Sequence, residues 1–370
     1  MLIVQLKSWF SSSKAVLIAT GTIFLANQLA ELFMVLLVAS NYGLGSEYSY
    51  VCQWDCHWFA DIVRNGYDLF PHGNPRGNAA NWAFFPFFPL SASGFAFVTG
   101  LPAWLSLVVV AKIFFLLAIY SFIQLCKAYE PAIPALLAGG VIAFNPYSIY
   151  ASVGYTEAMF LFFTCQFFIA LKGNHFLLAG LMGGLLSGVR LVGVIATVPY
   201  LIKAIPHGLS TSQQERIRLV LGLLLVPLGL GFFMYFLYWR TGDALAFSHI
   251  IQLGWNRHVD NPLSYLLEAL KGDRMYKFFV LIAFLSFFIS FRLFLQKRYT
   301  LASFLLICTI IPISSGLLSL PRYIAWQAPF LFGIADILNK RNAWILIMPI
   351  FIIGFAYMYF SWIAGKSFVI

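Results

Sequence analysis

An acidic and aromatic segment follows the first apolar run and holds the residues best suited to chemistry. Residues 53–67 read QWDCHWFADIVRNGY, and NWAFFPFFP follows at 81–89. Asp55 stands next to Trp54, where a membrane anchor would need a cation, because anionic headgroups disfavour a carboxylate. The segment therefore predicts a site at the membrane surface. The alternative is an interfacial anchor whose tryptophans lie among the headgroups.

Two further motifs bring charge into apolar surroundings. In FNPYSIYASVGYTEAMF, Asn145 and Pro146 break a helix, and Glu157 opens the next apolar run after tyrosines that suit hydroxyl-rich ligands. Glu157 could instead be an ordinary helix-start acid that complements the helix dipole. Arg190 lies in SGVRLVG, and an intramembrane arginine faces a cavity or a partner such as a phosphate or Glu157. Its alternative is to snorkel from a helix end.

Two later motifs combine arginine with aromatic rings. Trp255, Arg257 and His258 form one cluster in the sequence GWNRH. Arg322 and Tyr323 stand at the start of a later apolar run. The planar guanidinium fork suits phosphate, so both motifs predict contacts to an anionic headgroup or phosphate. The alternatives are an ordinary solvated loop and a snorkelling arginine at a helix end.

The remainder of the chain is strongly apolar. Of 370 residues, 61% are hydrophobic and 10% are charged, whereas a soluble domain carries about 25% charged residues. The sequence therefore predicts one all-α polytopic membrane domain over 1–370, with outer loops 41–101 and 240–275 forming the site. The net charge of +10 is attributed to cations in cytoplasmic loops and not to nucleic-acid binding.

Ten apolar runs are candidates to cross the membrane, and two segments are ambiguous. Prolines interrupt 84–99, and Arg190 breaks 175–204. If 84–99 is interfacial and 175–204 is a two-piece hairpin, most loop cations face the cytoplasm and the polar motifs share the outer face. In the alternative, 84–99 spans, 175–204 is continuous, and 145–157 moves inside. The ten runs are 15–40, 102–127, 131–150, 153–171, 175–204, 217–239, 276–295, 299–318, 323–339 and 343–364.

Two of the five cysteines, Cys52 and Cys56, flank Asp55 and are spaced to share one helix face. A disulfide between them is open. A zinc site is not predicted, because no second Cys/His pair lies nearby to complete it. The other three cysteines lie in apolar runs and are expected to pack as small hydrophobic residues.

The ordered set of motifs resembles the PIG-V family, the GPI mannosyltransferase 2-like proteins within the GT-C group of membrane glycosyltransferases. The resemblance extends over 53–323, most of the chain. The chain is shorter than is expected of eukaryotic members, so a bacterial relative is expected. The matching residues are Trp54-Asp55, Phe59, Gly66-Tyr67, AFFPFFPL at 83–90, Asn145-Pro146, Tyr155-Thr156-Glu157-Ala158, Arg190, Gly193, Trp255, Arg257 and Arg322.

The resemblance implies a GT-C-type fold with about 10–11 transmembrane helices and interfacial helices in the first outer loop. It also implies transfer of a hexose, expected to be mannose, from a polyprenyl (dolichyl-type) phosphate to a glycolipid or other acceptor hydroxyl. Asp55 maps to the general base of an inverting reaction, with Glu157 as the reserve base or the partner of Arg190. The donor phosphate is expected to contact Arg190, Arg257, Arg322 and His258. The sugar and acceptor are expected to contact Trp54, His57, Trp58, Asp61, Tyr67, Asn145, Tyr155, Trp255 and Tyr323.

The same resemblance sets the expected surroundings. No metal or other cofactor is expected, because arginines flank the phosphate leaving group. A bacterial member would lie in the cytoplasmic membrane among membrane lipids, with its site on the periplasmic face, and a eukaryotic member would lie in the ER membrane. The absence of a nucleotide-binding fingerprint favours a lipid-borne donor.

Two other function classes compete with the transferase. A lipid-linked sugar transporter or flippase would use charges inside helices, such as Glu31, Lys112 and Arg190, as a path. An inverted repeat would favour this class, and none is visible in the sequence. A non-catalytic membrane scaffold explains the composition but not the combination of aspartate, arginine and tryptophan.

Overall fold

The computed structural model describes residues 2–42, 51–72, 78–340 and 343–366. Over these ranges the secondary structure is helical, apart from one isolated bridge between His72 and Ala79. The predicted all-α class is therefore confirmed. Two parts of the expected outer loop 41–101, at 43–50 and 73–77, lie outside the described residues.

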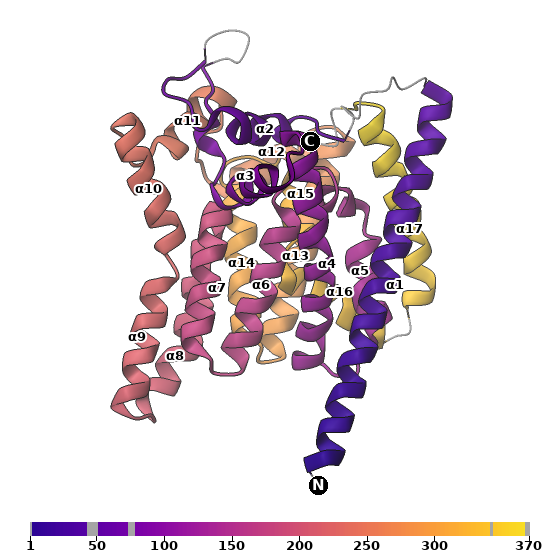
Figure 1. Cartoon of the computed structure of the whole chain (residues 1–370), viewed down its shortest axis with the longest axis vertical. Helices are drawn as coiled ribbons and strands as arrows, with labels where there is room; N and C mark the ends of the chain where they lie inside the picture. The colour runs from indigo at the N-terminus through magenta and orange to yellow at the C-terminus, as the bar shows by residue number, and fades with distance from the viewer. Residues whose placement is uncertain (1, 43–50, 73–77, 341–342, 367–370) are drawn as a thin grey trace.

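Long apolar helices form a bundle whose ends lie at two opposite faces (Figure 1). Within it, α4 packs against α6, and α13 packs against α14. These helices are apolar on most of their circumference, because one side meets the core and the other meets lipid. The bundle includes α1 (Leu2–Tyr42), α4 (Ala103–Tyr129), α6 (Glu157–Lys172), α13 (Arg274–Leu295), α14 (Tyr299–Ile313), α16 (Ala328–Lys340) and α17 (Trp344–Ile363).

Other elements are short or broken. Two α-helices joined by a bend of 42° make up the segment that begins at Gln213. The short helix at Ala135–Ala143 is followed by a 3-10 helix at Pro146–Ala151, which ends before Tyr155. These elements are α5 (Ala135–Ala143), η3 (Pro146–Ala151), α7 (Phe176–Val189), η4 (Leu191–Ala196), α8 (Thr197–Leu209), α9 (Gln213–Leu225), α10 (Leu228–Thr241) and α15 (Leu320–Ala325).

The run 175–204 is a two-piece hairpin, as loop charge indicated. Helix α7 ends at Val189, and Arg190 has an extended backbone with φ −153°. The following 3-10 helix η4 folds back so closely that a Cβ on Gly193 would lie 2.2 Å from the carbonyl oxygen of Leu186. Helix α8 then returns toward the end of the bundle where α7 begins (Figure 1). The break places Arg190 at the tip of the hairpin.

Glycines let this hairpin sit close to its neighbour α9. A Cβ on Gly180 would lie 2.1 Å from the carbonyl oxygen of Gly222, and one on Gly184 would lie 2.6 Å from that of Leu225. Small residues four apart allow such backbone contact between membrane helices. The spacing therefore fixes α7, and with it the position of Arg190.

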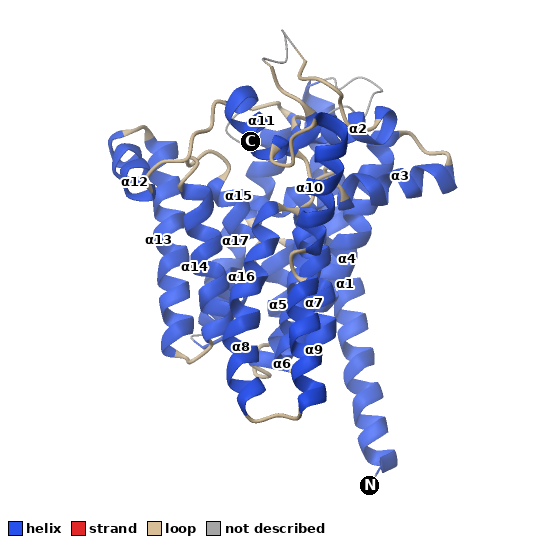
Figure 2. Ribbon diagram, turned by 90° about the vertical axis from the view of Figure 1, so that its left-hand side faces the viewer, coloured by secondary structure: helices blue, strands red, loops and turns tan. Residues whose placement is uncertain are grey.

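A cap of short helices covers the end of the bundle opposite the beginning of α1 (Figures 1 and 2). Helix α3 lies across this end instead of passing through the bundle, in agreement with the interfacial interpretation of 84–99. It has 13 residues, whereas a span needs about 20. The cap consists of α2 (Asp55–Asn65), η2 (Asn81–Ala83), α3 (Phe87–Thr99), α11 (Ala246–Trp255) and α12 (Pro262–Lys271).

Individual helices of spanning length are fewer than the expected 10–11. Five in the described ranges are long and apolar enough to cross a membrane, or six if the bent pair α9–α10 counts as one span. Breaks and 3-10 segments shorten several of the other runs. Three further apolar helices of 13–15 residues are α3, α7 and α14.

Candidate active site

Asp55 begins α2 on a backbone that is held from several directions. The Tyr155 hydroxyl accepts the Asp55 N–H at 3.2 Å and donates to the carbonyl oxygen of Gln53 at 3.1 Å. Trp54 has φ 46°, a left-handed conformation that is uncommon outside glycine. The Cys52–Cys56 disulfide closes the same turn covalently. The Asp55 carboxylate is thus presented by a fixed turn, and the two cysteines are not free to bind zinc.

Four charged side chains from separate elements form a continuous chain. Asp55 Oδ2 lies 3.1 Å from Arg322 Nη2 in α15, and Arg322 Nε lies 3.2 Å from Glu157 Oε1. The same Glu157 oxygen accepts from Arg190 Nη1 at 3.0 Å. Glu157 is 1% exposed and Arg322 is 5% exposed. Buried charges of this kind are stable only when they are paired.

Tyrosine rings surround the Arg322 guanidinium. Its central carbon lies 5.2 Å from the ring centres of both Tyr150 and Tyr155, and 5.0 Å from that of Tyr323. The Tyr323 ring also lies 4.7 Å from the Arg190 guanidinium. Contact between a guanidinium and a ring face is favourable. The two arginines are therefore fixed by both carboxylates and rings.

The cluster shifts the pKa values of its members in opposite directions. Burial works against the charged form of Arg322, but Tyr323 and Asp55 hold its pKa above the ordinary value. Burial also opposes ionisation of Tyr323, yet Arg322, Arg257 and Arg190 lower its pKa below the ordinary value. A buried hydroxyl that is easier to ionise indicates a positive local potential, which suits an anionic ligand.

Three buried atoms of this chain of charges retain hydrogen-bonding capacity. Glu157 Oε2, Arg322 Nε and Arg322 Nη1 make no hydrogen bond to the residues that the structure describes, although Arg322 Nε lies in ion-pair contact with Glu157 Oε1. Buried polar atoms are nearly always hydrogen-bonded in proteins. All three belong to residues that line a cavity, so they are suited to contact a polar ligand there.

The cavity has a volume of about 260 Å³, near the lower end of the range of about 300–1,000 Å³ for ligand pockets. It combines charged groups with an apolar wall. The lining from the predicted set is Asp55, Tyr155, Glu157, Arg190, Arg257, Arg322 and Tyr323. The apolar lining includes Phe59, Phe84, Phe85, Phe160, Phe247 and Ile251.

The structure thus brings together both predicted carboxylates and all three predicted arginines. The other residues predicted for the site do not line the cavity. They are Trp54, His57, Trp58, Asp61, Tyr67, Asn145, Trp255 and His258.

Three of these residues support the cavity wall from behind. Trp58 packs on Phe84 with ring centres 5.8 Å apart and on Trp255 at 5.5 Å. The Tyr67 hydroxyl donates to the carbonyl oxygen of Phe84 at 2.7 Å. Phe84 itself lines the cavity. These side chains therefore fix one apolar wall.

Four others have different surroundings. Trp54 packs edge-on against Trp362, with ring centres 4.7 Å apart. Asn145 caps η3, where its side chain accepts a backbone N–H two residues ahead at 2.9 Å. His57 and His258 are exposed, and His258 Nε2 lies 3.1 Å from the side-chain oxygen of Asn256.

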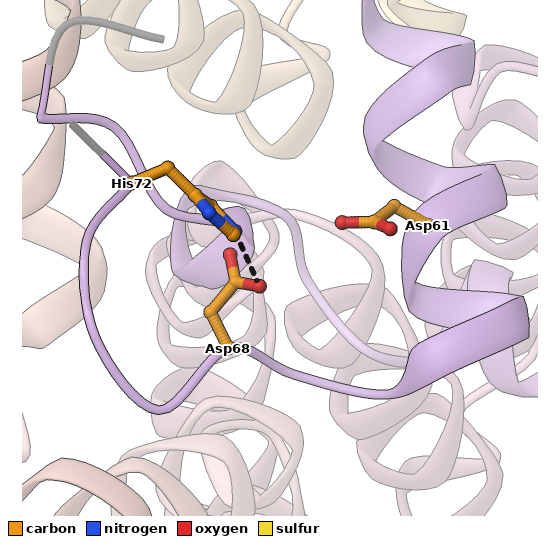
Figure 3. A group of neighbouring side chains, drawn as sticks. All are labelled: Asp61, Asp68 and His72. Carbon is orange, nitrogen blue, oxygen red and sulfur yellow. Dashed lines mark hydrogen bonds and ion pairs between the residues drawn. The ribbon is translucent and has the colours of Figure 1, made fainter. Parts of the chain in front are cut away.

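Asp61 lies near Asp68 and His72 in the first loop of the cap (Figure 3). The atoms of these three side chains that could bind a metal lie within 4.8 Å of one another. His72 Nε2 lies 2.9 Å from Asp68 Oδ1, and Asp68 Oδ2 accepts the N–H of Asn81 at 2.9 Å. Both Asp68 oxygens are therefore engaged by the protein. We interpret this group as structural, because its hydrogen bonds hold the loop against η2.

Two residues of the site had no role in the sequence-based prediction. Tyr150, one of the tyrosines predicted to suit hydroxyl-rich ligands, lies against Arg322 as described above. Trp326 lines the cavity and donates from Nε1 to the carbonyl oxygen of Tyr147 at 2.9 Å, and Gln327 lines it while only 4% exposed. A polar Gln327 inside an apolar run is the sequence signal that could have identified it.

Comparison with known proteins gives relatives over part of the chain. No protein-family profile matches it. The chain is 29% identical over 206 residues to GPI alpha-1,6-mannosyltransferase 2 of Cricetulus griseus, covering 50% of this chain and 40% of that protein. The protein of the same name from Mus musculus is 30% identical over 154 residues, covering 39% and 29%. The chain thus spans less than half the length of these relatives.

Comparison with solved structures gives matches at low identity. ArnT from Cupriavidus metallidurans, bound to undecaprenyl phosphate, has a TM-score of 0.48 and 13% identity, covering 86% of this chain and 67% of that one. The Archaeoglobus fulgidus oligosaccharyltransferase AglB, with an inhibitory peptide and a dolichol-phosphate, has a TM-score of 0.47 and 12% identity, covering 92% and 56%. The similarity to PIG-V proteins that the ordered motifs indicated is thus confirmed by sequence over half of the chain.

Proposed function

We propose that this chain is a membrane glycosyltransferase that moves a hexose from a polyprenyl (dolichyl-type) phosphate to an acceptor hydroxyl. The observation that carries the proposal is a cavity in which Asp55 lies among Arg190, Arg257 and Arg322. A hydroxyl nucleophile needs a base, and a phosphate leaving group needs cations. The mannosyltransferase names of the curated relatives support mannose as the sugar.

In the proposed reaction, the acceptor oxygen attacks the anomeric carbon as the bond from that carbon to the phosphate oxygen breaks. Asp55 accepts the proton of the acceptor hydroxyl, and polyprenyl phosphate leaves with the bonding electrons. Attack opposite the leaving group inverts the anomeric configuration. The Asp55 side chain is 24% exposed, so its carboxylate remains accessible from the cavity.

The three arginines have different tasks in this proposal. Arg322 is fixed between Asp55 and Glu157, so it orients the base. Among the described residues, the Arg257 side chain makes one long hydrogen bond, of 3.5 Å, to the carbonyl oxygen of Leu318. The Arg190 side chain is 19% exposed. Arg190 and Arg257 are therefore the groups assigned to the leaving phosphate. The proposal assigns this charge to arginine and requires no resident metal.

The Cys52–Cys56 disulfide supports a site on the outer or lumenal side. Disulfides persist in oxidising compartments and are rare where cytosolic thiols keep them reduced. This disulfide flanks Asp55 directly. A periplasmic or lumenal site would meet a lipid-linked donor and a glycolipid acceptor in the same leaflet.

A transporter is less well supported by the same structure. Lys112 Nζ and Glu31 Oε2 pair at 2.8 Å between α4 and α1. Arg190, the third charge of the predicted path, instead contacts Glu157 in the cavity. The charges therefore belong to two separate groups and do not form one path.

The test is sugar transfer in liposomes from synthetic polyprenyl-phosphate-mannose, with membrane lipid extract as acceptor. Asp55→Asn is expected to lower turnover by about 10²–10⁴-fold, the usual contribution of a general base. Glu268→Gln is the matched control, because Glu268 is an exposed carboxylate in α12 of the cap. Full activity of Asp55→Asn would refute the assignment of the base. Movement of the donor between leaflets without transfer would instead favour the transporter.

A further inference from the structure

Residues at the end of α6 and the beginning of α14 line a second pocket. These segments lie at the end of the bundle opposite the cap (Figures 1 and 2). Its volume is about 420 Å³. Four cationic side chains line it, and no carboxylate is part of its lining. They are Lys172 from α6, Lys203 from α8, and Lys297 and Arg298 from the turn between α13 and α14.

The charges of this basic pocket are poorly neutralised by the protein. Arg298 Nη2 pairs with Glu130 Oε2 at 2.7 Å, and Arg298 Nη1 is buried without a hydrogen bond to any described residue. Lys172 Nζ lies 4.3 Å from the ring centre of Tyr129. Within the described ranges, Lys172, Lys203 and Lys297 form no ion pair with a carboxylate. The pocket therefore carries an excess of positive charge.

Two other cations at this end of the bundle are paired with a carboxylate. Arg292 Nη1 lies 2.6 Å from Asp336 Oδ2, and Lys340 Nζ lies 3.4 Å from Asp336 Oδ1. A general excess of cytoplasmic cations explains why lysine and arginine are frequent at this end. It does not explain why four of them converge on one pocket.

Helix dipoles explain only part of the cluster. Lys172 lies in the last turn of α6, where a cation is favoured. Lys297 and Arg298 follow Gln296, the C-cap of α13, where a cation is also favoured, but Arg298 is at the same time the N-cap of α14. A cation is disfavoured at a helix N-terminus, because the free N–H groups there are already positive. An anion beside Arg298 and the start of α14 would offset this unfavourable contact.

The start of α14 can itself contribute donors. The helix has 15 residues, and Tyr299 and Thr300 of its first turn line the pocket. N–H groups in the first turn of a helix have no acceptor within it. One arginine, three lysines and two residues of this first turn thus line one pocket, and their donor types match the oxygens of a phosphate group.

We propose that this basic pocket binds a phosphate group at the membrane surface opposite the transferase cavity. The proposal is independent of the proposed transfer reaction. The phosphate can come from an anionic lipid headgroup or from free phosphate in solution. The α8 surface beside the pocket favours lipid, because Ile202, Ile205 and Leu209 are 36%, 60% and 79% exposed on that helix and can contact acyl chains.

The test measures lipid binding to the delipidated, full-length protein by native mass spectrometry and by thermal stability. Phosphatidylglycerol is compared with phosphatidylcholine, and inorganic phosphate forms a third arm. The variant Lys203→Gln/Lys297→Gln removes two charges from the pocket. Arg216→Gln/Arg218→Gln removes two charges from α9 at the same end of the bundle and is the matched control.

Selective binding of phosphatidylglycerol by the wild type is expected. The pocket variant should bind it about 30-fold more weakly, since each cation near an anionic lipid contributes about 1 kcal/mol. Stabilisation by inorganic phosphate that the pocket variant alone loses would retain the site but assign it to a soluble phosphate. Equal losses in the pocket and α9 variants, or no preference for any anion, would overturn the proposal. Lys203→Gln alone provides a milder variant should the double variant fold poorly.

Discussion

At the scale of single residues, the two carboxylates of the cavity have different surroundings and so different tasks. Glu157 is 1% exposed and contacts both Arg190 and Arg322. Among the arginines that the structure describes, Asp55 pairs with Arg322 alone, and its side chain is 24% exposed. A buried carboxylate between two guanidiniums holds them in place and balances their charge. An accessible carboxylate can instead accept a proton from a substrate.

This division predicts opposite behaviour for two isosteric variants. Glu157→Gln leaves both guanidiniums short of a counter-charge, and breaking a buried ion pair typically costs about 3–5 kcal/mol. Thermal unfolding of the purified protein should therefore show a clearly lower midpoint for Glu157→Gln. Asp55→Asn should unfold close to the wild type while losing transfer. A Glu157→Gln protein with wild-type stability and no transfer would instead make Glu157 the base.

At the scale of elements, the turn before α2 is the part most specialised for the site. The Tyr155 hydroxyl bridges Gln53 and Asp55, and the disulfide closes the turn around Trp54. Gly154 fits beneath it, since a Cβ there would lie 2.7 Å from Cys56 Sγ and its φ is 76°. The segment that leads to Glu157 is thus packed directly on the segment that carries Asp55.

The disulfide is therefore expected to position the base. Cys52→Ala/Cys56→Ala should keep the fold, because the hydrogen bonds of Tyr155 remain, but turnover should fall by about 10–100-fold, since a misplacement of about 1 Å can cost about 10²-fold. A reductant should lower transfer by the wild type and leave the double variant unchanged. Wild-type turnover in the double variant would show that the disulfide does not position Asp55.

The elements that could be predicted are those indicated by a pattern within one short segment of the sequence. The interfacial α3 follows from its prolines and short apolar length, and the hairpin tip at Arg190 follows from a charge inside an apolar run. Long-range packing decided the rest. Arg322 lies at the centre of the charged cluster because it pairs with Asp55 and Glu157, which belong to two other elements. The sequence does not show which elements pack together in this way. The sequence also does not show whether an aromatic residue such as Trp58 lines a cavity or packs behind the residues that line it.

At the scale of the whole molecule, the two ends of the bundle differ in chemistry. The cap and the turn between α13 and α14 lie at opposite ends of the bundle (Figure 1). Residues of the cap helices α2 and α11 line the cavity that holds Asp55, and residues of the turn between α13 and α14 line the basic pocket. An oxidised cysteine pair is typical of the outer side, and clustered lysine and arginine are typical of the cytoplasmic side. Both signals therefore support the proposed orientation, with the cavity on the outer or lumenal side.

This orientation predicts which positions a membrane-impermeant maleimide can reach in sealed cells. Glu268→Cys in α12 should be labelled from outside, whereas Arg216→Cys in α9 should be labelled only after the membrane is permeabilised. Background labelling should be low, because the free cysteines are buried; they are Cys126, Cys165 and Cys308. The reverse pattern would place the cavity and the Cys52–Cys56 disulfide in the reducing cytoplasm. It would contradict a lumenal or periplasmic transferase while leaving the geometry of Asp55 and its arginines unchanged.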